Sequence, residues 1–421
     1  MLQIAFPNDG GMVFDEAHYI PASQDTLGGI AANAEHPPLP KLISALGIGL
    51  LGNNWFGWRF PQVLMQIAAM YLFYLIARRL LGERWGLLAT MFLGLDTVWF
   101  IHGGTLLIDM PMFLFGLLAI ELYMRKRPWL SAASMGLAFT AREMSIFWFG
   151  ALVIYHLYTN RQTMGPALRV GVKYLAVALL VFGVVMFAYD IRYQPPISTS
   201  VTTTVNTQVI ENNGTAVTTF TTTFLSTSKQ VIWNPIQHVL FIYQYHGPSG
   251  IVIDEPYAPY QFAWNWILPF DPVPFNGTYH APEPFNSATY YRVDVDVSAG
   301  NVTNHYIPTW YQAQANLAVW YGFWPALAGA IYLILKRRET GTALFIAGGI
   351  ALNYAPWLAL SVLVRRIGFN YYFIYTLPFV ALGLAFFYKQ MPSKYGRELA
   401  VLNLVLALFF FVWFFPVRPL T

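Results

Sequence analysis

Two polar motifs, FDEAHY (residues 14–19) and EHPPLPK (residues 35–41), immediately precede a long series of apolar segments. Carboxylates and cations at the edge of a bilayer are costly and are usually kept there for a function. The order of polar motifs and apolar segments therefore indicates an integral membrane protein whose polar N-terminal part forms a candidate reaction site.

The composition excludes several other classes of protein. The chain has 421 residues, of which 56% are hydrophobic and 10% are charged, and its mean hydropathy is +0.46. Soluble domains carry about 25% charged residues. The net charge of +4 comes mainly from cations at the ends of apolar segments, so we expect no nucleic-acid partner. Without cysteine there is no disulfide framework and no thiolate ligand or nucleophile.

The apolar segments predict an all-α polytopic fold with about ten transmembrane helices, because a span needs about 20 apolar residues. Residues 130–158 are too long for one helix and are interrupted by Arg142-Glu143, so we expect two short helices there. The predicted segments are 60–81, 85–101, 105–124, 130–158 (a broken pair), 171–189, 313–335, 341–363, 370–388 and 398–415.

These segments divide the chain into four predicted parts. They are an external catalytic loop with an interfacial helix (1–59), an N-terminal bundle (60–189), an external loop domain (190–312) and a C-terminal bundle (313–421). Most basic residues fall on one side, which is therefore predicted to be cytoplasmic. The two polar motifs then face the outside of a plasma membrane, or the lumen of an ER-type membrane. The N-terminus also comes out external, so we expect a first span that this numbering lacks.

The external loop is predicted to contain β-structure. The β-prone runs 201–210 and 216–225 flank Asn212-Asn213-Gly214, and Asn-Gly between such runs is a strong hairpin signal. Three N-glycosylation sequons, at Asn213, Asn276 and Asn301, lie in the same loop and agree with an external position.

Three acids are candidate catalytic residues. Asp15 could act as a general base towards a hydroxyl, with Glu16 positioning it; the alternative is a solvated pair of loop carboxylates. Asp109, just before Pro111 at the start of a predicted helix, is either functional or a simple cap. Asp96 and His102 could line the same cavity, although each is better explained as a satisfied residue of the bundle.

The cations are candidates for an anionic ligand. His36 and Lys41, stiffened by prolines, would lie at an anionic headgroup, unless the segment is only a turn before the apolar helix 42–51. Arg142 would bind phosphate, or else pair structurally with Glu143. Arg365 and Arg366 could clamp phosphate oxygens or anchor the interface. Nucleotide-binding and hydrolase motifs are absent from the sequence, and the eight scattered histidines form no metal pattern.

Taken together, these motifs resemble those of the protein O-mannosyltransferases, which belong to the polyprenyl-phosphate-sugar-dependent membrane glycosyltransferases of GT-C fold. FDEAHY resembles that family's Asp-Glu motif, and HPPLPK (36–41) its His-Pro-Pro-Leu-x-Lys motif. The stretch from Leu95 to Asp109, GLAFTAR (136–142) and the late segment from Asn353 to Pro378 resemble its remaining motifs. The chain departs from the pattern at Gly104, where many members have Arg, and at Tyr372, where His is common.

The resemblance implies an enzyme that moves a hexose, most simply mannose, from a dolichyl-phosphate-type donor to a Ser or Thr hydroxyl of an external protein, with inversion. It implies Asp15 as base, Asp109 as a sugar or acceptor ligand, and Tyr371 in the donor site. We expect membrane lipids as partners, a membrane-protein complex as a further option, and no cofactor; a divalent metal between the acids is the less favoured alternative. Competing hypotheses are a lipid or glycan acceptor, a non-catalytic membrane subunit, and a transporter.

Overall fold

The computed structural model describes residues 12–13, 15–193, 206–212, 215–223, 234–246, 262–268, 287–298, 301–364 and 368–413. For strands β2 to β5 it describes the backbone alone.

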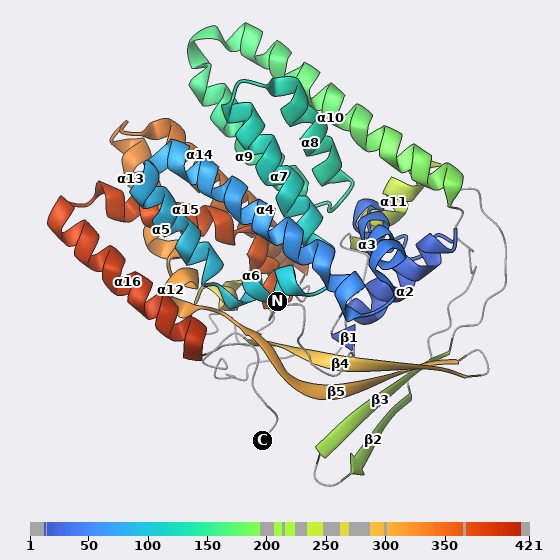
Figure 1. Ribbon diagram of the computed structural model, residues 1–421. Coiled ribbons are helices and arrows are strands. Elements are labelled where there is room, and N and C mark those ends of the chain that lie inside the picture. Colours follow the sequence, from blue (N-terminus) through green and yellow to red (C-terminus); the bar gives the residue numbers. More distant parts are fainter. Residues whose placement is uncertain are drawn as a thin grey trace.

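Helices make up most of the described chain (Figure 1). The α-helices are α2 Glu16–Leu27, α3 Leu39–Leu51, α4 Trp55–Leu81, α5 Glu83–Gly94, α6 Thr97–Gly104, α7 Asp109–Met124, α8 Pro128–Phe139, α9 Ser145–Thr159, α10 Met164–Arg192, α11 Pro235–His246, α12 Leu317–Trp320, α13 Phe323–Leu335, α14 Thr340–Val364, α15 Leu377–Gln390 and α16 Ser393–Trp413. The 3-10 helices are η1 Arg161–Thr163, η3 Ala263–Trp266 and η4 Asn370–Tyr375. The strands are β1 Met12–Val13, β2 Asn206–Asn212, β3 Thr215–Thr223, β4 Ser287–Ser298 and β5 Asn301–Gln314.

Helix α15 lies at the centre of the C-terminal half of the bundle. Every residue from Leu377 to Phe386 is buried, so this helix is apolar on all sides and packs against neighbours all round. It packs closely on α13 and α14. A Cβ on Gly349 of α14 would lie 2.0 Å from the Phe379 ring, so that position requires glycine. This close contact fixes the distance between α14 and α15, and with it the position of η4 just before α15.

Five helical segments are long and apolar enough to cross a membrane. They are Trp55–Leu81, Arg161–Arg192, Leu317–Leu335, Thr340–Leu363 and Ser393–Trp413; a sixth is obtained if the bent pair α5–α6 counts as one span. The chain is thus an all-α membrane protein in its main body. The count of ten spans stays a prediction.

Two of the predicted spans differ in detail from the structure. Segment 85–101 is not one helix, because α5 and α6 meet at an angle of 70°. The bend occurs where the Asp96 side chain caps α6, accepting the Trp99 N–H at 3.0 Å. Segment 370–388 begins as the 3-10 turn η4 and becomes α-helical only at Leu377. In both places the apolar pattern continues across a break that local hydrogen bonding creates.

The predicted break in segment 130–158 is confirmed. Helix α8 ends at Phe139 and α9 begins at Ser145, with the Arg142 carbonyl accepting hydrogen bonds from the Ser145 N–H at 3.1 Å and its hydroxyl at 2.6 Å. The charged pair Arg142-Glu143 therefore lies in the turn between two short helices, where its side chains are not forced into an apolar helix face.

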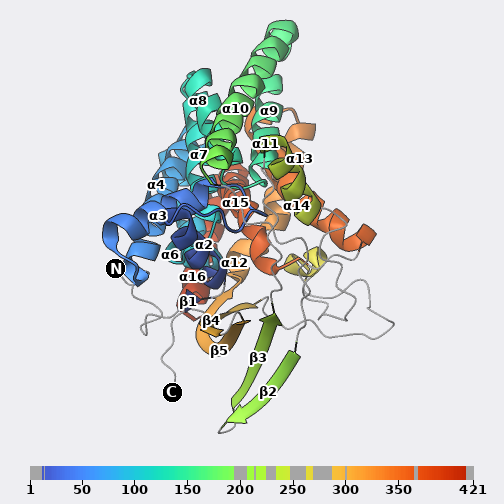
Figure 2. The same ribbon diagram turned by 90° about the vertical axis from the view of Figure 1, so that its right-hand side faces the viewer.

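A five-stranded antiparallel sheet of order β1-β4-β5-β3-β2 lies at one end of the helices (Figures 1 and 2). The register pairs Asn212 with Thr215, which confirms the predicted hairpin, although the described strands are shorter than the predicted runs. Asn301 begins β5, whereas Asn213 and Asn276 lie outside the described residues. That the sheet belongs to an external domain stays a prediction, as does glycosylation.

Candidate active site

A cavity of about 300 Å³ lies where the two polar N-terminal motifs meet the helices. Its wall comes from the start of α2, the loop before α3, the junction of α6 and α7, the α8–α9 turn, α11 and η4. The lining residues are Asp15, His18, Tyr19, Asn33, Glu35, His36, His102, Leu107, Ile108, Asp109, Arg142, Tyr245, Phe369, Tyr371 and Tyr372. Segments far apart in the sequence thus converge on one polar hollow.

Asp15 is the N-cap residue of α2, yet its side chain makes no capping hydrogen bond. An Asp at this position usually caps the helix and contributes about 1 kcal/mol in doing so. Here the half-buried carboxylate borders the cavity instead. Burial raises the pKa of Asp15, and Asp109 adds to the rise, while the positive charge of His18 and Arg142 opposes it. The result is a carboxylate that is a stronger base than a solvated Asp.

Glu16 does not line the cavity, which corrects its prediction as a catalytic residue. It is fully buried on the other side of α2, where Arg59 of α4 donates to it through Nε at 2.9 Å and Nη2 at 2.6 Å. Its Oε1 also accepts the Leu106 N–H at 2.8 Å. Glu16 therefore joins α2 to α4 and to the α6–α7 junction, and its role in positioning Asp15 stays a prediction.

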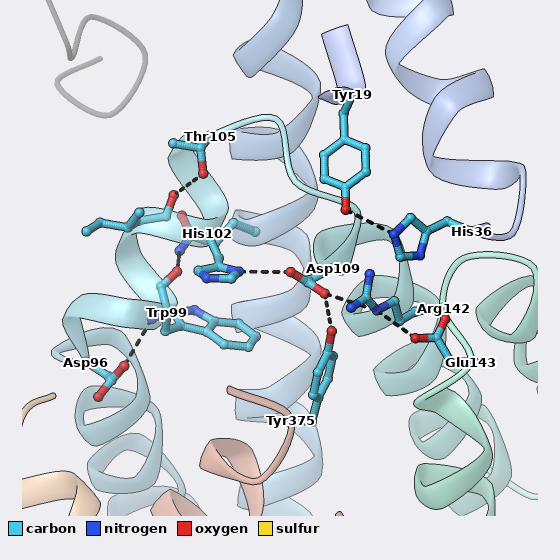
Figure 3. A network of polar contacts seen from close by, with 12 residues as sticks. Tyr19, His36, Asp96, Trp99, His102, Thr105, Asp109, Arg142, Glu143 and Tyr375 are labelled. Atoms are coloured by element: carbon cyan, nitrogen blue, oxygen red, sulfur yellow. Dashed lines mark hydrogen bonds and ion pairs between the residues drawn. The ribbon is translucent and has the colours of Figure 1, made fainter. Parts of the chain in front are cut away.

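Asp109 lies at the centre of a polar network at the start of α7 (Figure 3). The His102 ring contacts its Oδ2 through Nδ1 at 2.9 Å, and the Tyr375 hydroxyl donates to its Oδ1. The Arg142 Nε lies 3.8 Å from the same Oδ1. The predicted place of Asp109 and Pro111 in the first turn of a helix is confirmed. Because several groups hold this carboxylate, it is fixed in orientation beneath the cavity.

Arg142 lies between two carboxylates. Its Nε is 3.2 Å from Glu143 Oε1 and 3.8 Å from Asp109 Oδ1, and its side chain is buried while still bordering the cavity. The pair with Glu143 is thus present, and Arg142 at the same time borders the cavity. Among the predicted Lys and Arg residues that the structure describes, Arg142 is the one that lines the cavity.

The loop Asn33–His36 forms one side of the cavity and is held from behind by Lys41. The ammonium donates to the carbonyls of Asn33 and, at 2.9 Å, of His36. The backbone of Asn33 has φ 53°, a left-handed conformation that Asn tolerates better than most residues. This backbone shape directs the Asn33 carbonyl to Lys41 and keeps the side chains of the loop on the cavity.

Lys41 thus supports the loop from behind and does not border the cavity, so this position does not support its predicted place at an anionic headgroup. It is 1% exposed and absent from the cavity wall, and burial lowers its pKa to about 7, despite the opposing effect of Glu35 and Asp190. His36 does line the cavity, and its Nε2 lies 3.4 Å from the Tyr19 hydroxyl; its place at an anionic headgroup stays a prediction.

An aromatic wall closes the cavity on the η4 side. Tyr371 packs against the His102 ring at 5.5 Å and is stacked on Phe369 at 5.4 Å. Tyr372 is stacked on Trp357 of α14 at 4.3 Å. Aromatic faces of this kind pack well against sugar rings and apolar chains. Tyr371 is thus on the wall, and its role in the donor site stays a prediction, whereas Arg365 and Arg366 lie outside the described residues.

Sequence reasoning missed or undervalued three residues of the site. His102 was considered a bundle residue, yet it both lines the cavity and contacts Asp109. Tyr375 carried no signal in the sequence, since its approach to Asp109 depends on the packing of η4. Glu35 was quoted only as part of a motif. Asp96, by contrast, is the satisfied bundle residue that was expected, bonded to Trp99 and, at 2.8 Å, to Trp320 Nε1.

Comparison with known proteins finds a family model that matches part of the sequence, and solved structures that share the fold. Residues 35–189 match the sequence model of the dolichyl-phosphate-mannose-protein mannosyltransferase family. Two structures share the fold of nearly the whole chain. One is a protein O-mannosyltransferase complex of S. cerevisiae bound to the sugar donor, with TM-score 0.67, 11% identity and coverage of 99% of this chain and 88% of that chain. The other is ArnT from Cupriavidus metallidurans bound to undecaprenyl phosphate, with TM-score 0.55, 13% identity and coverage of 96% and 61%.

The chain has the O-mannosyltransferase-like GT-C fold. Curated relatives match a shorter part of this chain than the two solved structures do. A polyprenol-phosphate-mannose–protein mannosyltransferase of Mycolicibacterium smegmatis is 32% identical over 135 residues, which is 30% of this chain and 26% of that protein. A protein of the same name from Mycobacterium tuberculosis is 34% identical over 108 residues, 24% of this chain and 21% of that protein. The match thus spans about a quarter of the length of these relatives.

Proposed function

We propose that the chain is a membrane glycosyltransferase that moves a sugar, in the simplest case mannose, from a polyprenyl-phosphate donor to a hydroxyl of an external protein. One observation carries this proposal. The half-buried Asp15, whose carboxylate makes no capping hydrogen bond, lines the same cavity as the network of Asp109, Arg142 and His102. The family model that matches residues 35–189 and the names of the curated relatives supply the class of donor.

In the proposed reaction Asp15 takes the proton of a Ser or Thr hydroxyl. The resulting oxygen attacks the anomeric carbon from the side opposite the phosphate, so the C–O bond to the acceptor forms as the C–O bond to the phosphate breaks. The product then has the inverted configuration at that carbon, and polyprenyl phosphate leaves. A raised pKa favours Asp15 as the base, because basic strength increases with pKa.

The leaving phosphate needs positive charge rather than an acid. Arg142 is the described cation that borders the cavity, and charge stabilisation of this kind is commonly the largest contribution in such reactions. In this proposal Arg365 and Arg366, just before Phe369 of the aromatic wall, add further positive charge. Asp109 holds Arg142 and His102 in place, and the faces of Tyr371 and Phe369 support the sugar or the first isoprene unit.

The experiment is a transfer assay on the full chain in proteoliposomes. We expect labelled mannose to pass from a polyprenyl-phosphate donor to a Ser/Thr peptide and not to its Ala analogue. Asp15→Asn should lower the rate of transfer at least about 100-fold, whereas Asp25→Asn, on the exposed face of the same helix, should leave it unchanged. Absence of transfer by the wild-type chain, over several donor sugars and over peptide, glycan and lipid acceptors, would refute the enzyme and favour a non-catalytic subunit.

A further inference from the structure

A second, larger cavity lies at the opposite end of α7 from Asp109. It has a volume of about 720 Å³ and is lined by the ends of α4, α7 and α9 and by the starts of α8 and α10. It shares no lining residue with the candidate active site. Since a helix rises 1.5 Å per residue, the 16 residues of α7 separate the two cavities by about 20 Å. Nothing in the proposed reaction uses this second cavity.

Positive charge is concentrated on its wall. Arg79 and Arg125 share one buried carboxylate, Glu121, at 3.0 and 2.7 Å, so this group of three keeps a net positive charge. Lys126 also lines the cavity, and no carboxylate of the described chain lies within ion-pair distance of it. An anion would therefore find an arginine and a lysine on the same wall.

The backbone at Lys126 supports a role for its side chain. The residue has φ 58°, in the left-handed region where a non-glycine residue costs about 1 kcal/mol or more. Glycine is the usual residue in this conformation just after a helix, because it avoids that cost. A lysine kept in a strained conformation at the mouth of a cationic cavity points to an anionic ligand.

The start of α10 adds a third source of positive potential. The N-cap residue Thr163 makes no side-chain capping bond, and Thr163, Pro166 and Ala167 line the cavity. The start of a helix carries partial positive charge, which favours anions.

The cationic cavity continues into an apolar groove of about 230 Å³ between α9 and α10. The two hollows share Tyr123, His156 and Val170. Beyond them the groove is lined by apolar side chains of both helices, including Leu152, Leu157, Leu168, Val172 and Leu175. Helix α10 lies along the outer edge of the bundle, as Figure 1 shows, and only 17% of its most apolar window is buried.

Tyr123 and His156 mark the boundary between the polar and apolar parts. The carbonyl of Ala167 can only accept, so His156 Nε2, at 2.9 Å, carries a proton and donates to it. The Tyr123 hydroxyl contacts Nδ1, so both ring nitrogens of His156 have partners within the protein. Tyr123 and His156 are therefore hydrogen-bonded within the protein. We expect the charged group of a ligand to lie at Lys126 and Arg79 instead.

We propose that the two connected hollows bind one anionic phospholipid of the surrounding bilayer. Its headgroup phosphate lies against Lys126, Arg79 and the first turn of α10, and one acyl chain follows the groove between α9 and α10. The phosphate matches the charge of the wall, and the acyl chain matches a groove that opens on the exposed flank of α10. The proposal is independent of the transfer reaction.

Native mass spectrometry of the full chain, with phosphatidylglycerol and phosphatidylcholine of identical acyl chains, tests this assignment. We expect tighter retention of phosphatidylglycerol. Lys126→Gly should weaken that binding about tenfold, as for loss of one charge-assisted hydrogen bond, while leaving the melting temperature unchanged or raising it because glycine relieves the strained backbone. Arg161→Gln, at an exposed basic residue of the same end that lines neither hollow, is the control and should bind as the wild type does.

A second pair of variants tests the acyl-chain groove. A Cβ at Gly171, which lines the groove, would meet only the His156 ring at 3.9 Å, so Gly171→Leu fills the groove without moving backbone. Gly183→Leu on the same helix meets nothing within 4 Å and is its control. Only Gly171→Leu should lose the lipid. Equal binding of the two phospholipids, undiminished binding by Lys126→Gly, or preference for polyprenyl phosphate over phosphatidylglycerol would overturn the proposal, whether or not the chain transfers sugar.

Discussion

The buried ion pair between Glu16 and Arg59 gives the sharpest test of how the site is built. Both side chains are 0% exposed, and Glu16 also accepts the Leu106 N–H. Glu16→Gln removes the negative charge that pairs with the buried Arg59 guanidinium, and breaking a buried pair in this way costs about 3–5 kcal/mol. We therefore expect Glu16→Gln to lower the thermal stability of the chain in detergent by several degrees. Asp15 is adjacent to the altered residue, so transfer should fall as well.

The double variant Glu16→Gln/Arg59→Gln separates positioning from catalysis. With both charges gone the desolvation cost disappears and an amide pair can remain hydrogen-bonded, so most of the lost stability should return, and with it most of the transfer rate. Melting curves and single-turnover rates on the four members of the cycle give the coupling directly. A Glu16→Gln chain that keeps wild-type stability but transfers no sugar would refute the positioning role and return Glu16 to the reaction itself.

Three further predictions concern the cavity. Burial raises the pKa of Asp15, and the base must be deprotonated, so the rate of transfer should fall as the pH decreases, with a midpoint above the ordinary pKa range of Asp. This acid limb of the pH profile should vanish in Asp15→Asn. The same limb in both proteins would contradict the assignment of Asp15 as the base. Tyr375→Phe removes a hydrogen bond to Asp109 and should lower kcat about tenfold with little change in donor KM, whereas a change in KM alone would place Tyr375 at the donor. Tyr371→Ala should raise the donor KM about tenfold through loss of the ring face while Tyr371→Phe stays near wild type, and equal effects of the two would show that the hydroxyl matters instead.

Much of the bundle follows from hydropathy alone, since apolar length and the Arg142-Glu143 interruption predict where helices begin and end. What hydropathy does not contain is the hydrogen bonding that bends an apolar run. Asp96 caps α6 and turns segment 85–101 into two helices, and η4 precedes α15 within one continuous apolar stretch. A carboxylate inside an apolar run could have signalled the first of these breaks; the second has no such mark.

The candidate site shows the same division between motif and geometry. The motifs located Asp15, His36, Asp109 and Arg142, and all four border the cavity. They did not reveal which charged residues of α2 and of the proline loop line the cavity and which lie on the opposite side. Glu16 lies on the opposite side of its helix from Asp15, and the carbonyls behind the proline loop hold Lys41.

Contacts between distant segments could not be read from the sequence. The hydroxyl of Tyr375 reaches Asp109 across 266 positions of the chain, and only the packing of α15 against α14 brings it there. Such residues become predictable once the helices around them are placed.

The central claim is that Asp15 removes the acceptor proton, whereas other residues of the same cavity bind the donor. Its most direct measurement is single-turnover transfer from a labelled polyprenyl-phosphate sugar by wild type and Asp15→Asn, with donor affinity determined on the same samples and the anomeric configuration of the product read by NMR. The account predicts unchanged donor affinity, a rate at least 100-fold lower in the variant, on the order expected for losing a general base, and an inverted product from the wild type. A variant that transfers at the wild-type rate, or a product that retains the donor's configuration, would contradict it.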